Sequence, residues 1–261
     1  MSFLDEQFGL AGEVAVVTGG TGELCSAMAE GMARAGARVV LVGRDKDKAE
    51  RRIQAIRKAG GDATFIAADV TKKADLERAA AETKKTYGKV TIAVNGAGAN
   101  SPTPFLDITD EEMQRLIDTN YKSVVFGCQV FGKAMIDQKE GGAIVNISSV
   151  SAPRSLSRVF TYSATKAAVL NLTYNLAREW APHAIRVNAL CPGFFPAEQN
   201  RKVLTPDRVS KVMAHTPLAR FGEPQELVGA ALLLCARKAG SFITGSHLVV
   251  DGGFTCMEIP S

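Results

Sequence analysis

Short runs of apolar, β-branched residues alternate with longer stretches of helical periodicity along the whole chain. The runs are continuously apolar, which is typical of strands whose two faces are both covered by helices. They predict seven strands, at residues 14–18, 38–42, 63–68, 90–95, 143–148, 186–191 and 247–250. The stretches between them predict helices at 26–35, 46–58, 73–86, 110–138, 162–180 and 223–236. This order predicts an α/β fold: a doubly wound, seven-stranded parallel sheet with helices on both faces.

The composition points to one domain spanning residues 1–261. The chain is 46% apolar, shows no internal repeat and has no stretch rich enough in Pro, Gly or Ser to form a linker. Its net charge of +4 is spread thinly, without the clustered basic face that nucleic-acid binding requires. The N-terminus lacks the pattern of a signal peptide, and the longest apolar run, 228–236, is too short to span a bilayer. We therefore expect neither a nucleic acid nor a membrane among its partners.

The cysteines and histidines favour a cytoplasmic protein without a metal. Five cysteines form no C-x-x-C motif, and an odd count favours reduced thiols, most of them buried in the core. The three histidines lack the spacing and carboxylate companions of a zinc site.

A tyrosine and a lysine provide candidate acid–base chemistry. Tyr162 and Lys166 are four residues apart, so on a helix they project from the same face. An ammonium beside a phenol favours the phenolate and is expected to pull the phenol pKa down toward neutrality. Ser149, thirteen residues before Tyr162, supplies a hydroxyl that can polarise a carbonyl. Such a group suits the interconversion of a carbonyl and an alcohol, which also needs a hydride carrier.

A glycine-rich turn follows the first predicted strand. Residues 18–22 read Thr-Gly-Gly-Thr-Gly and lead directly into a helix. Glycines there allow positive φ and close approach of the backbone, and a helix N-terminus offers free N–H groups to a pyrophosphate. Glycines also simply make turns, but this position between a strand and a helix favours a nucleotide site.

The end of the second strand indicates which nucleotide binds. A carboxylate there would hold the adenosine ribose hydroxyls, but the chain has Gly43, and the following Arg44 offers a bidentate partner for a 2′-phosphate. This pair favours NADPH over NADH. The alternative is that Arg44 is a solvated charge and that Asp45 or Asp47 holds the ribose.

Two further strand ends carry candidate cofactor contacts. Asp69 and Val70 follow the third strand, where a carboxylate can accept a hydrogen bond from the adenine amino group. Asn95, Gly96 and Ala97 follow the fourth, where small residues let the backbone approach the cofactor. Both segments also fit ordinary turn chemistry.

These motifs, in this order, resemble the short-chain dehydrogenase/reductase family over essentially the whole chain. The matching elements are Thr18-Gly19, Asn95-Gly96-Ala97-Gly98, Asn120, Asn146-Ile147-Ser148-Ser149, Tyr162 with Lys166, Arg186-Val187-Asn188, Pro192-Gly193 and Val250-Asp251-Gly252-Gly253. The resemblance implies a single NAD(P)-binding Rossmann domain that carries both the cofactor and the substrate sites.

The resemblance also implies roles for individual residues. Tyr162 would be the acid/base, Lys166 would lower its pKa and bind the nicotinamide ribose, Ser149 would hold the substrate oxygen, and Asn120 would position a water in a proton relay. The implied cofactor contacts are Gly19, Thr21, Gly22, Leu24, Arg44, Asp69, Val70, Asn95, Gly96, Ala97, Tyr162, Lys166, Pro192, Gly193 and Phe195. The same resemblance implies a homotetramer, built from four-helix contacts of 110–138 and 162–180 and from the C-terminal helix and strand.

The chain departs from the family pattern in two places. The usual turn reads T-G-x-x-x-G-x-G, but the second and third glycines fall here on Glu23 and Cys25. We expect Gly22 to take over the tight turn and Glu23 to point outward, because a carboxylate beside a pyrophosphate is unfavourable. Ala197 stands where the family often has a threonine that contacts the carboxamide.

A narrower resemblance concerns the substrate. Segments 18–29, 192–201 and 218–224 are similar to the branch of keto-sugar-acid reductases that includes D-mannonate oxidoreductase, or fructuronate reductase. A sugar acid needs a cation for its carboxylate and polar side chains for its hydroxyls. The candidate substrate residues are Ser151, Arg154, Arg158, Phe194, Gln199, Asn200 and Arg201. For each of these polar residues, a solvated surface role is an equal alternative.

Three other functions remain open. An acyl-carrier-protein thioester reductase would need a cationic docking patch, for which Arg154, Arg158, Arg201 and Lys202 are available. A reductase of apolar ketones would use Phe160, Phe194 and Phe195 as pocket walls. A nucleotide-sensing module without catalysis would lack part of the catalytic tetrad that the resemblance implies. All four positions of this tetrad are filled here, by Asn120, Ser149, Tyr162 and Lys166.

Overall fold

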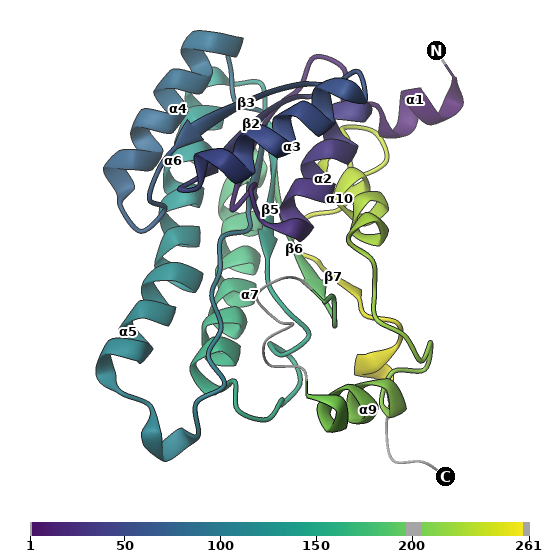
Figure 1. Ribbon diagram of the computed structural model, residues 1–261. Coiled ribbons are helices and arrows are strands. Elements are labelled where there is room, and N and C mark those ends of the chain that lie inside the picture. The colour runs from purple at the N-terminus through teal and green to yellow at the C-terminus, as the bar shows by residue number, and fades with distance from the viewer. Residues whose placement is uncertain (1, 197–204, 258–261) are drawn as a thin grey trace.

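The fold is built on a seven-stranded sheet in which every neighbouring pair of strands is parallel. The structure is a computed structural model that describes residues 2–196 and 205–257. The strand order is β3-β2-β1-β4-β5-β6-β7 (Figure 1). The strands are β1 Val14–Thr18, β2 Arg38–Gly43, β3 Asp62–Ala67, β4 Ile92–Asn95, β5 Gly142–Ile147, β6 Ile185–Pro192 and β7 His247–Val250. The predicted doubly wound sheet is confirmed.

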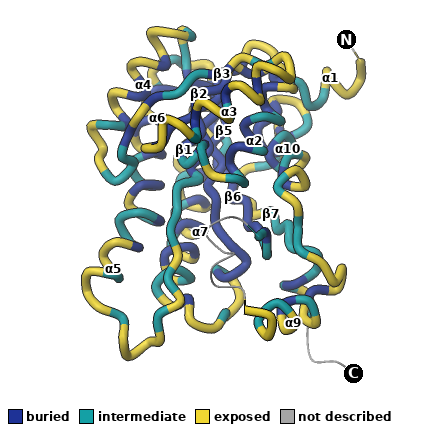
Figure 2. The backbone as a smooth tube through the Cα atoms, in the orientation of Figure 1, coloured by how far each residue is buried: buried dark blue, intermediate teal, exposed yellow. Residues whose placement is uncertain are grey.

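Helices cover both faces of the sheet. The helices are α1 Phe3–Phe8, α2 Glu23–Arg34, α3 Lys46–Lys58, α4 Lys73–Tyr87, α5 Asp110–Ile117, α6 Ser123–Gln138, α7 Phe160–Trp180, α9 Pro206–Ala214 and α10 Val228–Cys235. Apolar residues of α2, α3 and α10 share one core cluster with the sheet, and those of α4, α6 and α7 share another on the opposite face. Figure 2 shows the buried strands between these two layers.

Successive residues of a central strand enter the two different cores. In β1, Ala15 and Val17 pack in the cluster with α2, whereas Val16 packs in the cluster with α4 and α6. Because side chains alternate between the faces of a strand, burial of both faces requires an unbroken apolar run. This is the physical origin of the pattern seen in the sequence.

The helix predicted over 110–138 is not regular. A π-helical turn at Asp118–Lys122 separates α5 from α6. The stretch predicted as a helix over 223–236 begins with a 3₁₀ turn at Pro224–Leu227 before α10. Two helices, α1 and α9, were not predicted, although Thr205 followed by Pro206 is an ordinary N-terminal signal for α9.

The strand order reverses at the carboxyl ends of β1 and β4. The chain leaves β1 toward β2 and β3 but returns through β4 to the opposite side, which makes this pair the topological switch point where ligands bind in such sheets. Thr18 joins the two strand ends: its hydroxyl donates to the Val94 carbonyl at 3.3 Å and accepts from the Gly96 N–H at 3.1 Å. Within the described residues, no helix is long and apolar enough to cross a membrane.

Candidate active site

Tyr162 and Lys166 lie on the first turns of α7, beside the carboxyl end of β5. Lys166 is buried, and its Nζ donates a hydrogen bond to the Ile147 carbonyl at 2.8 Å. A second bond, from Ser148 Oγ to the Lys166 carbonyl at 2.9 Å, ties the helix backbone to the same strand end. The Lys166 Nζ lies 5.6 Å from the centre of the Tyr162 ring. The predicted placement on one helix face is therefore present.

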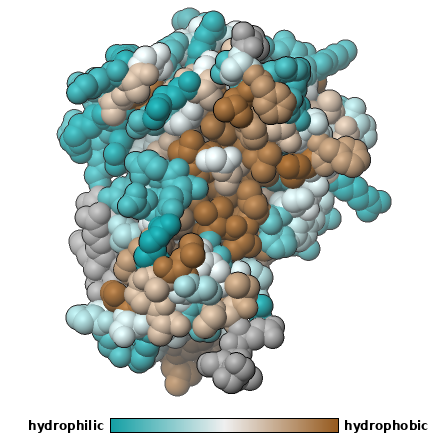
Figure 3. Space-filling view, turned by 90° about the vertical axis from the view of Figure 1, so that its right-hand side faces the viewer, coloured by the Kyte–Doolittle hydropathy of each residue, from teal (hydrophilic) through white to brown (hydrophobic). Residues whose placement is uncertain are grey.

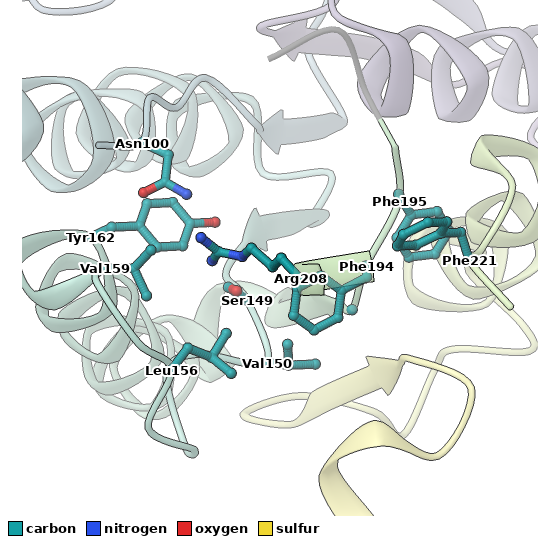
Figure 4. Close-up of a pocket in the computed structure, with 11 residues that line it drawn as sticks. Asn100, Ser149, Val150, Leu156, Val159, Tyr162, Phe194, Phe195, Arg208 and Phe221 are labelled. Atoms are coloured by element: carbon teal, nitrogen blue, oxygen red, sulfur yellow. The ribbon is translucent and has the colours of Figure 1, made fainter. Parts of the chain in front are cut away.

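Ser149 lies opposite Tyr162 in the same pocket. Its side chain is buried, and its Oγ accepts a hydrogen bond from the Ser151 N–H at 3.1 Å. Figure 4 shows the Ser149 and Tyr162 side chains turned toward the same space. A carbonyl oxygen between them would meet two hydroxyl groups, which suits polarisation and protonation of that oxygen.

The expected fall in the pKa of Tyr162 is not seen in the protein alone. Burial raises the pKa of the phenol above its ordinary value; a hydrogen bond with Ser149 opposes this rise, and the nearby Cys191 adds to it. Burial also lowers the pKa of Lys166 to about 8. The expectation was wrong for the cofactor-free protein because burial, which disfavours the charged phenolate, is the largest cause of the shift in the pKa of Tyr162.

Asn120 lies in the π-helical turn and is fully buried. Its Oδ1 accepts from the Ala99 N–H at 2.7 Å, and its Nδ2 donates to the Ala99 carbonyl at 2.9 Å and to Thr165 Oγ1 at 3.2 Å. These bonds join the loop after β4 to α7. A Cβ placed on Gly98 would lie 3.4 Å from Asn120 Oδ1 and 3.6 Å from Lys166 Nζ, so both groups flank this glycine. Extra helical turns of this kind are frequent at functional sites.

The glycine-rich turn fits a dinucleotide. Gly19 has φ +67°, and a Cβ there would lie 2.8 Å from the Ala97 amide nitrogen, so only glycine allows the loops after β1 and β4 to meet. Gly22 closes the turn through its N–H to the Gly19 carbonyl at 2.9 Å and is the N-cap of α2. No side chain caps this helix, so its first N–H groups are available to a phosphate.

The departure from the family pattern at Cys25 is accommodated by a glycine on the neighbouring loop. Cys25 occupies the position of the third glycine, and its Sγ donates a weak hydrogen bond to the Gly96 carbonyl at 3.7 Å. A Cβ on Gly96 would collide with this sulfur. The glycine at 96 therefore makes room for the larger side chain at 25. Burial raises the pKa of the Cys25 thiol to about 12, which keeps it neutral beside Lys166.

The end of β2 carries an exposed arginine, and it has a glycine where a carboxylate could bind the ribose. Arg44 is exposed. The Thr21 side chain lies against Gly43: a Cβ added to Gly43 would be 3.3 Å from Thr21 Oγ1. Asp45, one of the alternatives for the ribose, uses its Oδ1 to cap α3 through the Lys48 N–H at 2.9 Å. Asp69, after β3, accepts from Thr71 Oγ1 at 2.7 Å, which lowers the pKa of its carboxyl group.

The pocket beyond Ser149 and Tyr162 has a polar end and an apolar wall. Its lining is Asn100, Ser149, Val150, Leu156, Val159, Tyr162, Gly193, Phe194, Phe195, Arg208 and Phe221 (Figure 4). Phe194 and Phe195 were predicted, whereas Asn100 and Arg208 were not. The cap signal at Thr205 would have indicated α9 and placed Arg208 on its first turn.

Several predicted substrate residues lie elsewhere. Arg154 and Arg158 are exposed and do not line the pocket, and Ser151 is buried and does not line it either. Phe160 is 44% exposed and packs edge-on against Phe105, with ring centres 5.2 Å apart. The remaining predicted residues, Gln199, Asn200 and Arg201, lie outside the described residues.

Two glycines fix the segment that carries Phe194 and Phe195. Gly193 packs against Asp251, and a Cβ there would lie 2.6 Å from the Asp251 Cβ. Gly222 donates its N–H to the Phe194 carbonyl at 3.0 Å and leaves room for the Phe195 ring. The segment 218–224, on which part of the narrower resemblance rests, therefore packs against Phe194 and Phe195 of the pocket wall. The described residues contain no group of three or more metal-binding side chains.

Comparisons with known proteins agree with this geometry. A family model described as enoyl-(acyl carrier protein) reductase matches residues 23–255. An uncharacterised oxidoreductase of Bacillus subtilis, UxuB, is 38% identical over 94% of this chain and 95% of its own. A galactitol 2-dehydrogenase of Rhizobium johnstonii is 39% identical over 96% and 98%. The crystal structure of a gluconate 5-dehydrogenase from Burkholderia cenocepacia, in complex with NADP and tartrate, superposes with a TM-score of 0.92 at 32% identity, covering 97% of this chain and 99% of the other.

The chain belongs to the short-chain dehydrogenase/reductase family. It is an oxidoreductase that acts on CH–OH groups with a nicotinamide cofactor.

The raised pKa of Tyr162 can be measured directly. We predict that, without cofactor, this phenol ionises above the ordinary tyrosine value of about 10, so it remains a proton donor at neutral pH. The measurement is the tyrosinate absorbance of the wild-type protein minus that of Tyr162→Phe during an alkaline titration. Ionisation near neutral pH in the cofactor-free protein would contradict the prediction.

Proposed function

We propose that this protein is an NADPH-favouring reductase that interconverts a ketone and an alcohol on a sugar acid or keto-uronate, in the manner of the D-mannonate oxidoreductase branch. The observation that carries the proposal is that Ser149 and Tyr162 line one pocket, while the buried Lys166 and Asn120 flank Gly98, beside a turn that fits a dinucleotide. The bound nicotinamide supplies the hydride.

Each member of the tetrad has a task that follows from its position. Ser149 Oγ holds the substrate oxygen and stabilises negative charge as it develops there. Tyr162 donates its proton to that oxygen, which its raised pKa allows at neutral pH. Lys166 holds the nicotinamide ribose and, with a water on Asn120, returns a proton to the tyrosine. Assistance of this acid–base type contributes on the order of 10²- to 10⁴-fold to the rate.

The preference for NADPH rests on the end of β2. Gly43 provides no carboxylate to repel a 2′-phosphate, and the exposed Arg44 with the nearby Thr21 hydroxyl can receive one. Asp45 is committed to the helix cap, which weakens the alternative that it binds the ribose. NADPH, in turn, favours reduction of the carbonyl as the direction in the cell.

The sugar-acid substrate is supported by the relatives and by the polar end of the pocket. Galactitol and gluconate are the substrates named for two similar proteins, and both are polyhydroxylated. In this chain, Asn100 and Arg208 supply polar groups near Ser149. A cytoplasmic location, supported by four buried and unpaired cysteines, belongs to the same proposal.

A second candidate is the reduction of acyl-carrier-protein thioesters. Arg154 and Arg158 are exposed on the segment between β5 and α7, where a cationic docking patch would lie. The apolar wall of Leu156, Phe194 and Phe195 suits an acyl chain or an apolar ketone. We prefer the sugar acid because an acyl chain would place apolar carbons against the guanidinium of Arg208.

We also propose a homotetramer. The edge strand β7 is paired on one side only, and Figure 3 shows apolar surface over the face that carries α10 and β7. Phe242 is fully exposed, and Phe105 is 65% exposed next to α5.

Sedimentation equilibrium should therefore give four times the 27.7 kDa chain mass, and a monomer at micromolar concentration would refute the assembly.

Replacing Tyr162 by Phe tests the reaction. We expect Tyr162→Phe to remove turnover almost completely, because the variant keeps the ring but loses the proton donor, while the affinity for NADPH changes little. The assay follows NADPH absorbance with a panel of keto-uronates and with acetoacetyl thioesters. An unchanged kcat would rule out this role, and activity confined to thioesters would favour the second candidate.

Replacing Arg44 tests the cofactor preference. We expect Arg44→Ala to raise the KM for NADPH by about 10-fold or more, as for a lost charge-assisted hydrogen bond, with little change for NADH. Arg51→Ala, at an exposed position on α3, is the matched control and should change neither constant. If Arg44→Ala raised the KM for NADPH and for NADH equally, Arg44 would not be the residue that binds the 2′-phosphate.

A further inference from the structure

Among the described residues that line the pocket, Arg208 alone carries a charge. Its side chain is half-buried, and Figure 4 shows the guanidinium beside Tyr162 and Ser149, extending from the side of Phe194. The other described side chains of the pocket are neutral: Asn100, Ser149 and Tyr162 are polar, and the rest are apolar or glycine. A permanent positive charge therefore lies at the place where the substrate must enter.

The position of Arg208 is fixed by the packing of α9. Val212 is buried, and Thr216, just after the helix, donates its hydroxyl to the Val212 carbonyl at 2.7 Å. His215 packs on Phe254 with ring centres 4.9 Å apart, and Phe254 in turn packs on Phe194 at 5.0 Å. This chain of contacts holds the helix against the segment that follows Gly193. Arg208 is thereby aimed at the pocket by a folded element.

No carboxylate in the described part of the chain pairs with the Arg208 guanidinium. The neighbouring Asp207 is bonded to Lys211 at 2.8 Å, along the exposed side of the helix. Arg208 is also in the first turn of α9, where the helix dipole is positive and a cation is unfavourable. The arrangement leaves a site of uncompensated positive potential that an anion would neutralise.

We infer that Arg208 is the specificity residue that binds the carboxylate of the substrate, and that it selects carboxylated ketones over neutral ones. The inference rests on the proposed function and deepens it, since the cation needed by a sugar acid is assigned to α9 rather than to Arg154 or Arg158. Arginine suits the task because its planar fork matches both oxygens of a carboxylate. With the carboxylate on Arg208 and the reacting oxygen at Ser149 and Tyr162, the substrate is held at two points.

A different role for Arg208 would give a different kinetic result. A guanidinium that stabilised the developing oxyanion would act on every ketone, charged or neutral, and its loss would lower kcat for both. A carboxylate anchor acts before the reaction, so its loss raises KM for charged substrates alone. The comparison of a keto-sugar acid with the neutral ketose of the same chain length therefore separates the two roles.

The first experiment measures steady-state kinetics of Arg208→Gln with those two substrates. We expect KM for the keto-sugar acid to rise by about 10- to 100-fold, as for a lost charge-assisted pair, with kcat nearly unchanged. The kcat/KM for the neutral ketose should remain within about threefold of the wild-type value. Arg208→Lys, which keeps the charge, should recover part of the affinity, and it also guards against a general folding defect. An equal fall in kcat/KM for both substrates, or an unchanged kcat/KM for both, would overturn the inference.

The second experiment does not depend on turnover. Calorimetric titration of tartrate, a hydroxydicarboxylate, into the complex of the enzyme with NADP⁺ should show binding that weakens at least about 10-fold in Arg208→Gln. Arg154→Gln removes an exposed arginine outside the pocket lining and should bind tartrate like the wild type. Equal affinity in Arg208→Gln, or no binding to the wild type, would count against the inference. Arg208-dependent binding of tartrate without turnover of any keto-sugar acid would support the anchor while rejecting the proposed substrate.

Discussion

The buried ammonium of Lys166 is the constraint around which the rest of the site is arranged. A charge removed from water is costly unless hydrogen bonds compensate it, and here the Ile147 carbonyl at the end of β5 is the partner that the structure provides. Burial lowers the pKa of Lys166 to about 8, so part of that cost remains in the cofactor-free protein. An otherwise expensive group at the carboxyl end of the sheet is typical of functional sites.

The surrounding elements converge on this lysine. Tyr162 is one helical turn away, Gly98 allows the loop after β4 to approach, and Asn120 clamps that loop to α7. The parallel order of the strands brings these segments together, because the carboxyl ends of β1, β4 and β5 share one edge of the sheet. The fold thus determines where these candidate acid–base groups meet.

The sequence predicted the sheet and the shared helix face of Tyr162 and Lys166 because both depend on local patterns. The continuous apolar runs identified β1 and β7 with the bounds that the structure has, and the spacing of Tyr162 and Lys166 placed both on one helix. The π-helical turn at Asn120 was not predicted, because the sequence predicts one continuous helix over residues 110–138. The pKa of Tyr162 was misjudged because spacing reveals the neighbouring charge but not the burial that opposes it.

The proposed substrate site was harder to predict because its pocket is lined by residues from distant segments. Arg154 and Arg158 were predicted because they are close in sequence to Ser149 and Tyr162, yet neither lines the pocket, which instead includes Arg208. Arg208 reaches the pocket through tertiary contacts of α9 with Phe254 and Phe194, which no local pattern encodes. Cys25 is similar: it looks like an isolated departure in the sequence, and only the packing shows that Gly96 makes room for its sulfur.

The central claim is that a carboxylated ketone is held between Ser149 and Arg208 for reduction by NADPH. The most direct measurement is a crystal structure of Tyr162→Phe with NADPH and a keto-sugar acid, in which the complex cannot turn over. The account predicts the substrate ketone oxygen on Ser149 Oγ, the carboxylate on the Arg208 guanidinium, and the 2′-phosphate at Arg44. A substrate bound with its carboxylate on other residues and its ketone away from Ser149 would contradict it.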